Sequence, residues 1–226
     1  MNTSEKRGLT WGLLLLSAFG LWTLLIQCVD VRPVGQNGTP VGFAAFNVGF
    51  HRLTGVHLPL YVLTDWLGLV PIFICLCFAI LGACQLLRKR NLLRVDADIL
   101  LLGVYYVLVI LGYLLFEAFP INYRPVPIDG VMEASYPSST TLLVLSVMPT
   151  LHFQVARRCK NPHLLRASLI FSAGFSIFMI LGRLLSGVHW ATDIAGSVLL
   201  SSGLFLLYRT AVHIADRRAA TSPPEA

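Results

Sequence analysis

Six long runs of apolar residues, separated by shorter polar segments, dominate the pattern of this chain. A helix needs roughly 20 predominantly apolar residues to cross a bilayer, and runs of this kind are typical of membrane spans. They predict transmembrane helices at Leu9–Gln27, Leu58–Leu87, Ile99–Phe119, Ser139–Val155, Ala167–Leu185 and Trp190–His213. We therefore predict an all-α fold, a polytopic membrane protein with six transmembrane helices in one bundle.

The second predicted span, Leu58–Leu87, is longer than a bilayer requires, so we expect it to tilt or protrude. Pro71 is expected to kink this span, because proline lacks the N–H group that would continue the helix. Asp65, near the start of the span, is expected at the membrane interface. Before the span, the apolar stretch Val41–Phe50 predicts a short interfacial helix or a re-entrant piece.

Composition supports a membrane protein. The chain has 226 residues, of which 56% are apolar and 12% charged, whereas a soluble domain has about 25% charged residues. The net charge of +6 is compatible with nucleic-acid binding, but the basic residues gather at the ends of the predicted spans. Such clusters are typical of anchoring at the cytoplasmic face, so we expect membrane lipids, and no nucleic acid, as partners.

The basic residues also predict orientation. One set of basic residues falls in every second segment between the predicted spans, which is the pattern of six spans with both termini in the cytoplasm. This set is Lys6, Arg7, Arg88, Lys89, Arg90, Arg94, Arg157, Arg158, Lys160, Arg166, Arg209, Arg217 and Arg218. The other arginines, Arg32, Arg52, Arg124 and Arg183, fall on the opposite side. Because basic residues are disfavoured there, they point to function. We predict an integral protein of a bacterial plasma membrane, with its active site on the extracytoplasmic face.

Residues 1–218 are predicted to form one six-helix domain, and residues 219–226 a disordered cytoplasmic tail. The basic N-terminus followed by an apolar run resembles a signal peptide, but no cleavage site is evident, so we expect an uncleaved first span. Most of the five cysteines lie in or beside spans, where cysteine behaves as a small apolar residue. We expect no disulfide framework and no metal site. The sequence leaves the oligomeric state open.

Charged residues are scarce, yet Arg183, His189 and Asp193 gather around the start of the last predicted span. Histidine serves as a nucleophile or proton carrier, and an aspartate four residues later on the same helical face can fix its tautomer. The planar fork of arginine fits phosphate. A continuous helix would place Arg183 and His189 on different faces, so we expect a turn at Gly187 before a new helix begins at about Trp190.

A second segment, Pro137-Ser138-Ser139-Thr140, opens the fourth predicted span on the same side of the membrane. Hydroxyl residues at a helix start cap free backbone N–H groups, and the same N–H groups with the helix dipole form an anion site. Taken alone, capping and anion binding explain Ser138 and Ser139 equally well. The balance moves toward anion binding when the arginines are placed on the same face.

These groups together favour phosphoryl transfer through a phosphohistidine. His189 would attack phosphorus while Asp193 orients the imidazole ring. Arg124 and Arg183, with Ser138 and Ser139 at the helix start, would hold the phosphate oxygens.

The same residues resemble a known family, the type 2 phosphatidic acid phosphatase superfamily, also called the lipid phosphate phosphatases. Its motifs are Lys-x6-Arg-Pro, Pro-Ser-Gly-His and Ser-Arg-x5-His-x3-Asp. The chain keeps Arg124-Pro125, Pro137-Ser138 and Arg183, His189 and Asp193 at the family spacing, with Gly182 in place of the third motif's serine. The resemblance implies a six-helix fold, His189 as the nucleophile, and no metal or other cofactor.

Two further departures concern the family's lysine, which falls at Glu117, and its second histidine, which falls at Thr140. In the family that histidine protonates the leaving oxygen, and a threonine hydroxyl is a poor proton donor. Loss of a general acid typically costs about 10²–10⁴-fold in rate. Glu117, if desolvated and protonated, could supply the proton; alternatively it pairs with Arg124 or Arg183. His51 and His57 are further external candidates.

We therefore expect a metal-independent membrane phosphatase that removes phosphate from an outward-facing lipid phosphate or diphosphate. Phosphatidic acid, phosphatidylglycerol phosphate and polyprenyl diphosphate are candidate substrates. One alternative is a catalytically impaired relative that binds or transports a lipid phosphate, as Glu117 and Thr140 would favour. Another is a lipid phosphotransferase, which the sequence does not distinguish from a hydrolase because only the acceptor differs.

Overall fold

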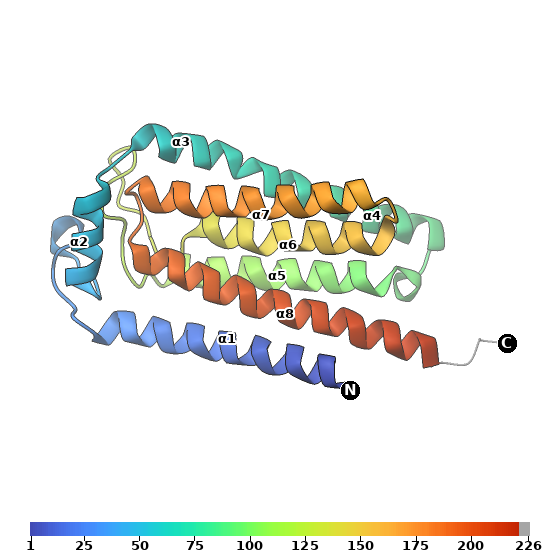
Figure 1. Ribbon diagram of the computed structural model, residues 1–226. Coiled ribbons are helices and arrows are strands. Elements are labelled where there is room, and N and C mark those ends of the chain that lie inside the picture. Colours follow the sequence, from blue (N-terminus) through green and yellow to red (C-terminus); the bar gives the residue numbers. More distant parts are fainter. Residues whose placement is uncertain (222–226) are drawn as a thin grey trace.

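The structure, a computed structural model, describes residues 1–221 and is helical through most of its length (Figure 1). The described residues form no β-strand longer than an isolated bridge. The elements are α1 (Thr3–Cys28), η1 (Gln36–Gly38), α2 (Ala44–Thr54), α3 (Leu58–Leu67), α4 (Leu69–Lys89), η2 (Leu92–Arg94), α5 (Ala97–Ala118), α6 (Ser139–Arg158), α7 (Pro162–Leu185) and α8 (Ala191–Thr221).

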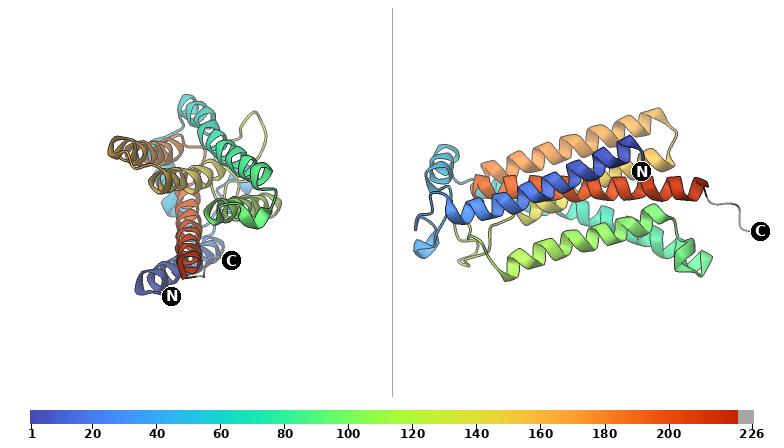
Figure 2. Two further views of the ribbon diagram at one scale, coloured as in Figure 1. Left: turned by 90° about the vertical axis from the view of Figure 1, so that its right-hand side faces the viewer. Right: turned by 90° about the horizontal axis from the view of Figure 1, so that it is seen from below.

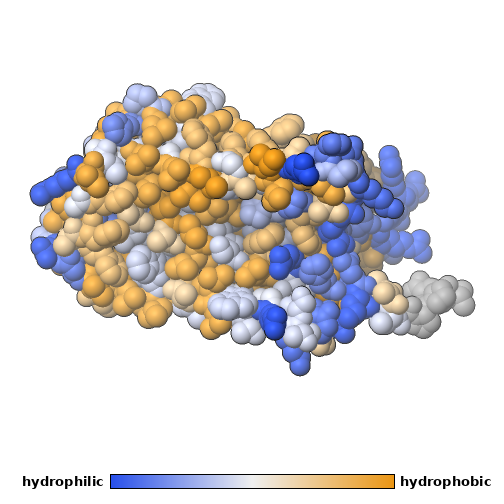
Figure 3. All heavy atoms as spheres, viewed as in Figure 1, coloured by the Kyte–Doolittle hydropathy of each residue, from blue (hydrophilic) through white to orange (hydrophobic). Residues whose placement is uncertain are grey.

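Six helical stretches, with α3 and α4 taken together, are long and apolar enough to cross a membrane. Viewed along the bundle in Figure 2, α6 lies among the other helices, and it contacts α4, α5, α7 and α8. Figure 3 shows a hydrophobic band around the middle, with hydrophilic residues gathered most densely at the end that carries the termini. The prediction of an all-α membrane fold with six spans is confirmed.

The second span breaks into α3 and α4 at Gly68. Pro71, one turn later, cannot donate to the carbonyl of Leu67, and its ring crowds that carbonyl. The span therefore bends just before Pro71, as the sequence indicates. The interfacial element also forms a helix, α2, although it begins at Ala44.

The C-terminal boundary differs from the prediction. Helix α8 continues through Thr221, so Ala219–Thr221, expected in a disordered tail, are helical. Alanine and arginine are strong helix formers and extend the last turns beyond the apolar part of the span. The rest of that predicted tail, residues 222–226, lies outside the described residues.

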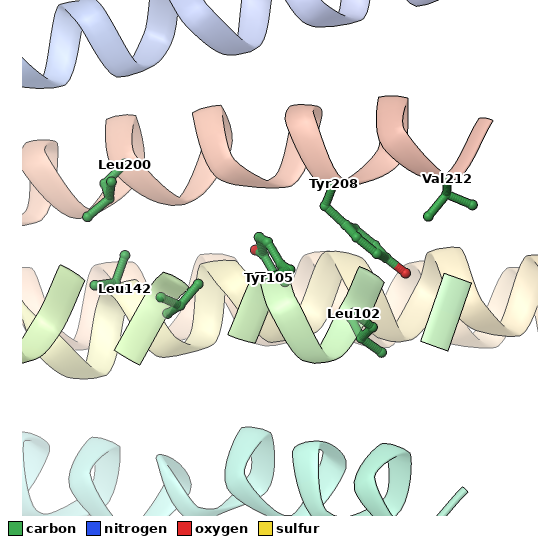
Figure 4. Packing of buried hydrophobic residues seen from close by; sticks show 7 residues of the cluster. Leu102, Tyr105, Leu142, Leu200, Tyr208 and Val212 are labelled. Atoms are coloured by element: carbon green, nitrogen blue, oxygen red, sulfur yellow. The ribbon is translucent and has the colours of Figure 1, made fainter. Parts of the chain in front are cut away.

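The largest buried apolar cluster joins α5, α6 and α8 (Figure 4). The Tyr105 and Tyr208 rings stack with centroids 5.2 Å apart, and the Tyr105 hydroxyl donates to the Ser146 carbonyl at 2.9 Å. Between membrane helices, close packing and such hydrogen bonds stabilise association, because lipid tails are as apolar as leucine. Small residues allow close packing between α1 and α8, where a Cβ on Gly203 would lie 3.2 Å from the Gly12 carbonyl oxygen.

A network of charged residues fastens the end of the bundle that carries the termini. Asp98 of α5 is buried and accepts hydrogen bonds from Arg157 and Arg158 of α6, each at 2.9 Å. Arg157 also binds the exposed Asp216 of α8 through two bonds of 2.7 and 2.9 Å. Asp98 is therefore the carboxylate on which both arginines converge.

We expect Asp98→Asn to lower the stability of the bundle, because it leaves two partly buried arginines without their shared counter-charge. Removing one partner of a buried ion pair costs up to about 3–5 kcal/mol. The matched control is Asp216→Asn at the exposed end of the same network, where about 0–1 kcal/mol is expected. Thermal unfolding in detergent, followed by circular dichroism, measures both; equal midpoints for the two variants would contradict this account.

Candidate functional site

The turn between α7 and α8 lies at the end of the bundle opposite the termini (Figure 1). It contains or borders Arg183, His189 and Asp193. Gly187 has a φ of 72°, and a Cβ there would lie 2.2 Å from the Gly55 carbonyl oxygen, so only glycine fits. The His57 N–H donates to the Ser186 carbonyl at 2.9 Å, and His51 Nε2 lies 3.0 Å from the Gly187 carbonyl oxygen. The predicted break between Arg183 and His189 is present, and the start of α3 holds it in place.

His189 lies in this turn and is buried, with 4% of its surface exposed. Its Nε2 lies 3.3 Å from Arg183 Nη2, and its Nδ1 lies 3.1 Å from Ser135 Oγ and 3.2 Å from the Ser135 carbonyl oxygen. A guanidinium can only donate, so Nε2 accepts and the ring proton resides on Nδ1. The Nε2 lone pair therefore faces the arginine, as a nucleophile directed at a bound phosphate requires.

Asp193 does not touch the His189 ring directly, since Oδ2 and Nδ1 are 3.7 Å apart. Ser135 lies between them: its hydroxyl donates to Asp193 and accepts from His189 Nδ1–H. Asp193 also accepts from Asn122 Nδ2 at 3.1 Å and from the Trp190 N–H at 2.9 Å. Asp193 therefore reaches the ring through Ser135, a residue that the sequence did not indicate.

The loop between α5 and α6 folds back on itself and positions the first motif. It has isolated bridges pairing Tyr123 with Ala134 and Ile128 with Val131. Asp129 and Gly130 both have positive φ at its tip, an Asp-Gly pattern typical of tight hairpin turns. Trp190 Nε1–H donates to the Tyr123 carbonyl at 2.8 Å, which ties this loop to the α7–α8 turn.

Arg124 and Arg183 converge on the Tyr61 ring of α3. Their Cζ atoms lie 5.7 and 4.9 Å from the ring centroid, and both side chains are buried. Arg124 Nη2 pairs with Glu133 Oε2 at 2.9 Å, and Arg183 Nη1 lies 3.6 Å from Asp65 Oδ1. Within residues 1–221, Nε and Nη1 of both arginines have no hydrogen-bond partner. Two adjacent cations thus present donors for an anion.

The second motif lies on the Arg124 side of the site, where Pro137 and Ser139 line a cavity together with Arg124. The Ser138 hydroxyl is 3.0 Å from Thr141 Oγ1 and is buried within the start of α6. Ser139 and Thr140 line an apolar cavity of about 330 Å³ between α3, α4, α5 and α6, and Asp65 lines the same cavity. Ser139 therefore faces open space, whereas the side chain of Ser138 is committed to the helix start.

Glu117 is exposed and lines a smaller cavity of about 140 Å³ together with Arg124 and Ser139. The expected alternative, an ion pair of Glu117 with an arginine, is wrong within the described residues: Arg124 pairs with Glu133 and Arg183 with Asp65. Sequence analysis missed both partners, since their proximity depends on how the loop and α3 fold.

The two further histidines do not join the arginines. His51 contacts the Gly187 carbonyl and packs against Trp190 with ring centroids 5.7 Å apart. His57 is exposed and its Nε2 lies 2.8 Å from the Thr54 carbonyl oxygen. The His51 ring therefore contacts the turn that carries His189, whereas His57 reaches that turn through its backbone N–H to Ser186.

Comparison with protein families gives a match that covers all three motifs. Residues 114–217 match the family model described as the PAP2 superfamily, the type 2 phosphatidic acid phosphatases. The resemblance is confirmed. A search of curated proteins found no match.

The fold has a solved counterpart. A transmembrane PAP2-type phosphatidylglycerolphosphate phosphatase from Bacillus subtilis superposes with a TM-score of 0.61, covering 95% of this chain and 98% of that one. At 16% sequence identity this likeness concerns the fold. The chain is an integral membrane protein with a PAP2 fold. At this low identity, the chemistry of its site depends on its own residues.

Burial lowers the pKa of His189 to about 4; Asp193 opposes this effect, and the charges of Arg183 and Arg124 add to it. We expect the ring to stay neutral down to about pH 5, whereas an unperturbed histidine titrates near 6.5. Because the unfolded chain binds this proton more tightly, the contribution of the neutral ring to stability is complete above about pH 6.5 and is lost toward pH 4. Ring ¹⁵N shifts, assigned with His189→Gln, measure the titration; a midpoint near 6.5 would contradict the proposed environment.

Proposed function

We propose that this protein is a metal-independent phosphatase that hydrolyses lipid phosphates or diphosphates through a phosphohistidine at His189. The observation that carries the proposal is the pair of buried guanidiniums, one of them beside His189 Nε2, with four nitrogens that have no hydrogen-bond partner within residues 1–221. Burying two cations side by side is costly unless an anion offsets their charge. A phosphate bears that charge and accepts several N–H donors at once.

In the first step, His189 Nε2 attacks phosphorus and the bond from phosphorus to the leaving oxygen breaks. The arginines hold the equatorial oxygens, where negative charge is spread in the transition state. Ser135 and Asp193 keep the proton on Nδ1 and stabilise the positive charge that develops on the ring. In the second step, water attacks phosphorus, the phosphorus–nitrogen bond breaks, and inorganic phosphate leaves.

The surroundings of the site support a lipid substrate and a position of the site on one face of the membrane. The apolar cavity lined by Thr140 and Asp65 lies within reach of the hydrocarbon region and suits the part of a lipid next to its phosphate. The site lies opposite the end that carries the termini, and the last turns of α4, α6 and α8 at that end contain Arg88, Lys89, Arg157, Arg158 and Arg218 (Figure 1). The positive-inside rule therefore supports an extracytoplasmic position of the site and cytoplasmic termini. Phosphatidylglycerol phosphate is a candidate because the solved counterpart is described as its phosphatase.

The environment of His189 favours catalysis over simple binding. A binding site needs the arginines but has no use for a neutral histidine whose Nε2 lone pair faces them, held by Ser135 and Asp193. A phosphotransferase would use the same groups with a second lipid as acceptor in place of water. Product analysis distinguishes these functions: release of inorganic phosphate identifies a hydrolase, and a newly phosphorylated lipid identifies a transferase.

We expect His189→Gln to abolish phosphate release and phosphoenzyme formation while the protein stays folded, because the amide cannot act as nucleophile. The measurement is release of ³²P-phosphate from phosphatidic acid, phosphatidylglycerol phosphate and a polyprenyl diphosphate, with and without chelator, plus acid-labile protein label. His163→Gln, at the other end of the bundle on α7, is the matched control. Turnover by His189→Gln at the wild-type rate would rule out this mechanism, and loss of wild-type activity with chelator would rule out metal independence.

We expect Ser135→Ala to lower the turnover number about 10–100-fold with little change in KM, since a hydrogen bond involving a charged group contributes about 1.5–3 kcal/mol. The loss should appear in the rate of phosphoenzyme formation and in the ¹⁵N shifts of His189, which a purely structural effect would leave unchanged. Ser135→Thr keeps the hydroxyl and should retain more activity. Equal rates for the alanine and threonine variants would contradict a positioning role.

A further inference from the structure

Helix α3, which none of the predicted site motifs includes, supplies two polar side chains to the site. Tyr61 and Asp65 are four residues apart, so they lie on the same face of the helix. Tyr61 lies against both arginines, and Asp65 lies 3.6 Å from Arg183. The Asp65 side chain is 57% exposed. An ionisable residue in a membrane span usually has a function, because placing its charge in lipid is costly.

Two departures from the family motifs both lie where α3 approaches the site. A Cβ on Gly182, which replaces the motif serine, would lie 2.5 Å from Thr64 Cγ2. The methyl group of Thr140, which replaces the motif histidine, would lie 3.5 Å from a Cβ on Gly68. Smaller residues at these two positions therefore leave room for α3, whose approach brings Asp65 to the cavity that Thr140 lines.

Asp65 and His189 lie beside the two different outer nitrogens of the Arg183 guanidinium. His189 Nε2 lies 3.3 Å from Nη2, and Asp65 Oδ1 lies 3.6 Å from Nη1. In-line displacement needs the nucleophile and the leaving oxygen on opposite sides of phosphorus. A phosphate bound across this fork with His189 on one side would turn its leaving oxygen toward Asp65 and the apolar cavity.

We propose that Asp65 takes over the proton transfers that the motif histidine performs in the family, acting on the reaction assigned above to this site. In the first step the Asp65 carboxyl gives its proton to the leaving oxygen as the phosphorus–oxygen bond breaks, and becomes a carboxylate. In the second step that carboxylate takes a proton from the attacking water as the phosphorus–nitrogen bond breaks.

The other carboxylates near the site are less well placed. Glu133 is paired with Arg124 at 2.9 Å, and Glu117 lines the separate small cavity on the Arg124 side. Asp129 and Asp65 line a further cavity of about 300 Å³, but Asp129 lies at the tip of the α5–α6 loop. Among these groups, Asp65 is the one that contacts Arg183 and shares a cavity with Thr140.

The test compares Asp65→Asn with wild type on two substrates in detergent micelles. Phosphatidic acid has an alkoxide leaving group that needs a proton, whereas the phenolate of p-nitrophenyl phosphate leaves without one. On phosphatidic acid we expect turnover to fall by about 10²–10⁴-fold. On p-nitrophenyl phosphate we expect a burst of about one nitrophenolate per protein, then slow turnover with phosphohistidine accumulating, because water attack lacks its base.

Two variants serve as controls. Asp65→Glu keeps the carboxyl and should retain turnover within about tenfold of wild type. Asp129→Asn removes the neighbouring carboxylate from a position where asparagine also tolerates positive φ, and should leave both rates unchanged.

Wild-type rates for Asp65→Asn would overturn the proposal. So would an equal loss on both substrates without a burst or label, since Asp65 would then only support Arg183. In either case the wild-type protein still releases phosphate, and the proposed function stands. A wild-type protein that neither releases phosphate from any lipid phosphate nor becomes labelled at His189 would instead refute the proposed function itself.

Discussion

The arrangement on which the rest of the site depends is the pair of guanidiniums over one aromatic ring. Arg124 and Arg183 come from a loop and from α7, and Tyr61 comes from α3. Two like charges held together in a poorly solvated place repel, so the surrounding fold must hold them there. Cation–π contact with Tyr61 and the carboxylates of Glu133 and Asp65 offset part of that repulsion. A bound phosphate would offset more of it, which couples substrate binding to the local stability of three separate segments.

The same positive charge explains why the histidine needs its own support. Burial and the neighbouring charge of Arg183 lower the pKa of His189, which favours a neutral ring whose Nε2 lone pair faces the arginine. A phosphoryl group added to that nitrogen makes the ring positive, and an adjacent negative group must then stabilise it. Asp193 provides that charge through Ser135 while it also accepts from Asn122. The carboxylate thus has several fixed donors, which holds it in one orientation.

Much of the architecture could be predicted from the sequence because hydropathy acts locally. Each span is a predominantly apolar run, and Gly187 marks the turn that brings Arg183 and His189 together. Ser135 and Glu133 could not be predicted as parts of the site, because their positions depend on how the α5–α6 loop pairs with itself. Asp65 was recognised only as an interfacial residue. Its contact with Arg183 requires the close approach of α3 and α7, which is a property of packing between distant segments.

The position of α3 gives one explanation for two departures from the family pattern, Gly182 and Thr140. Gly182 and Thr140 each look like a loss when compared with a motif, one of a serine and the other of an acid. In space Gly182 lies against Thr64 of α3, and Thr140 approaches Gly68 at the end of that helix. A fixed volume between helices can hold either a large motif side chain or a closer neighbouring helix, since interiors are closely packed. If the closer helix carries a carboxyl group, the proton-transfer chemistry is relocated and need not be abolished, and the geometry of in-line attack on phosphorus is preserved.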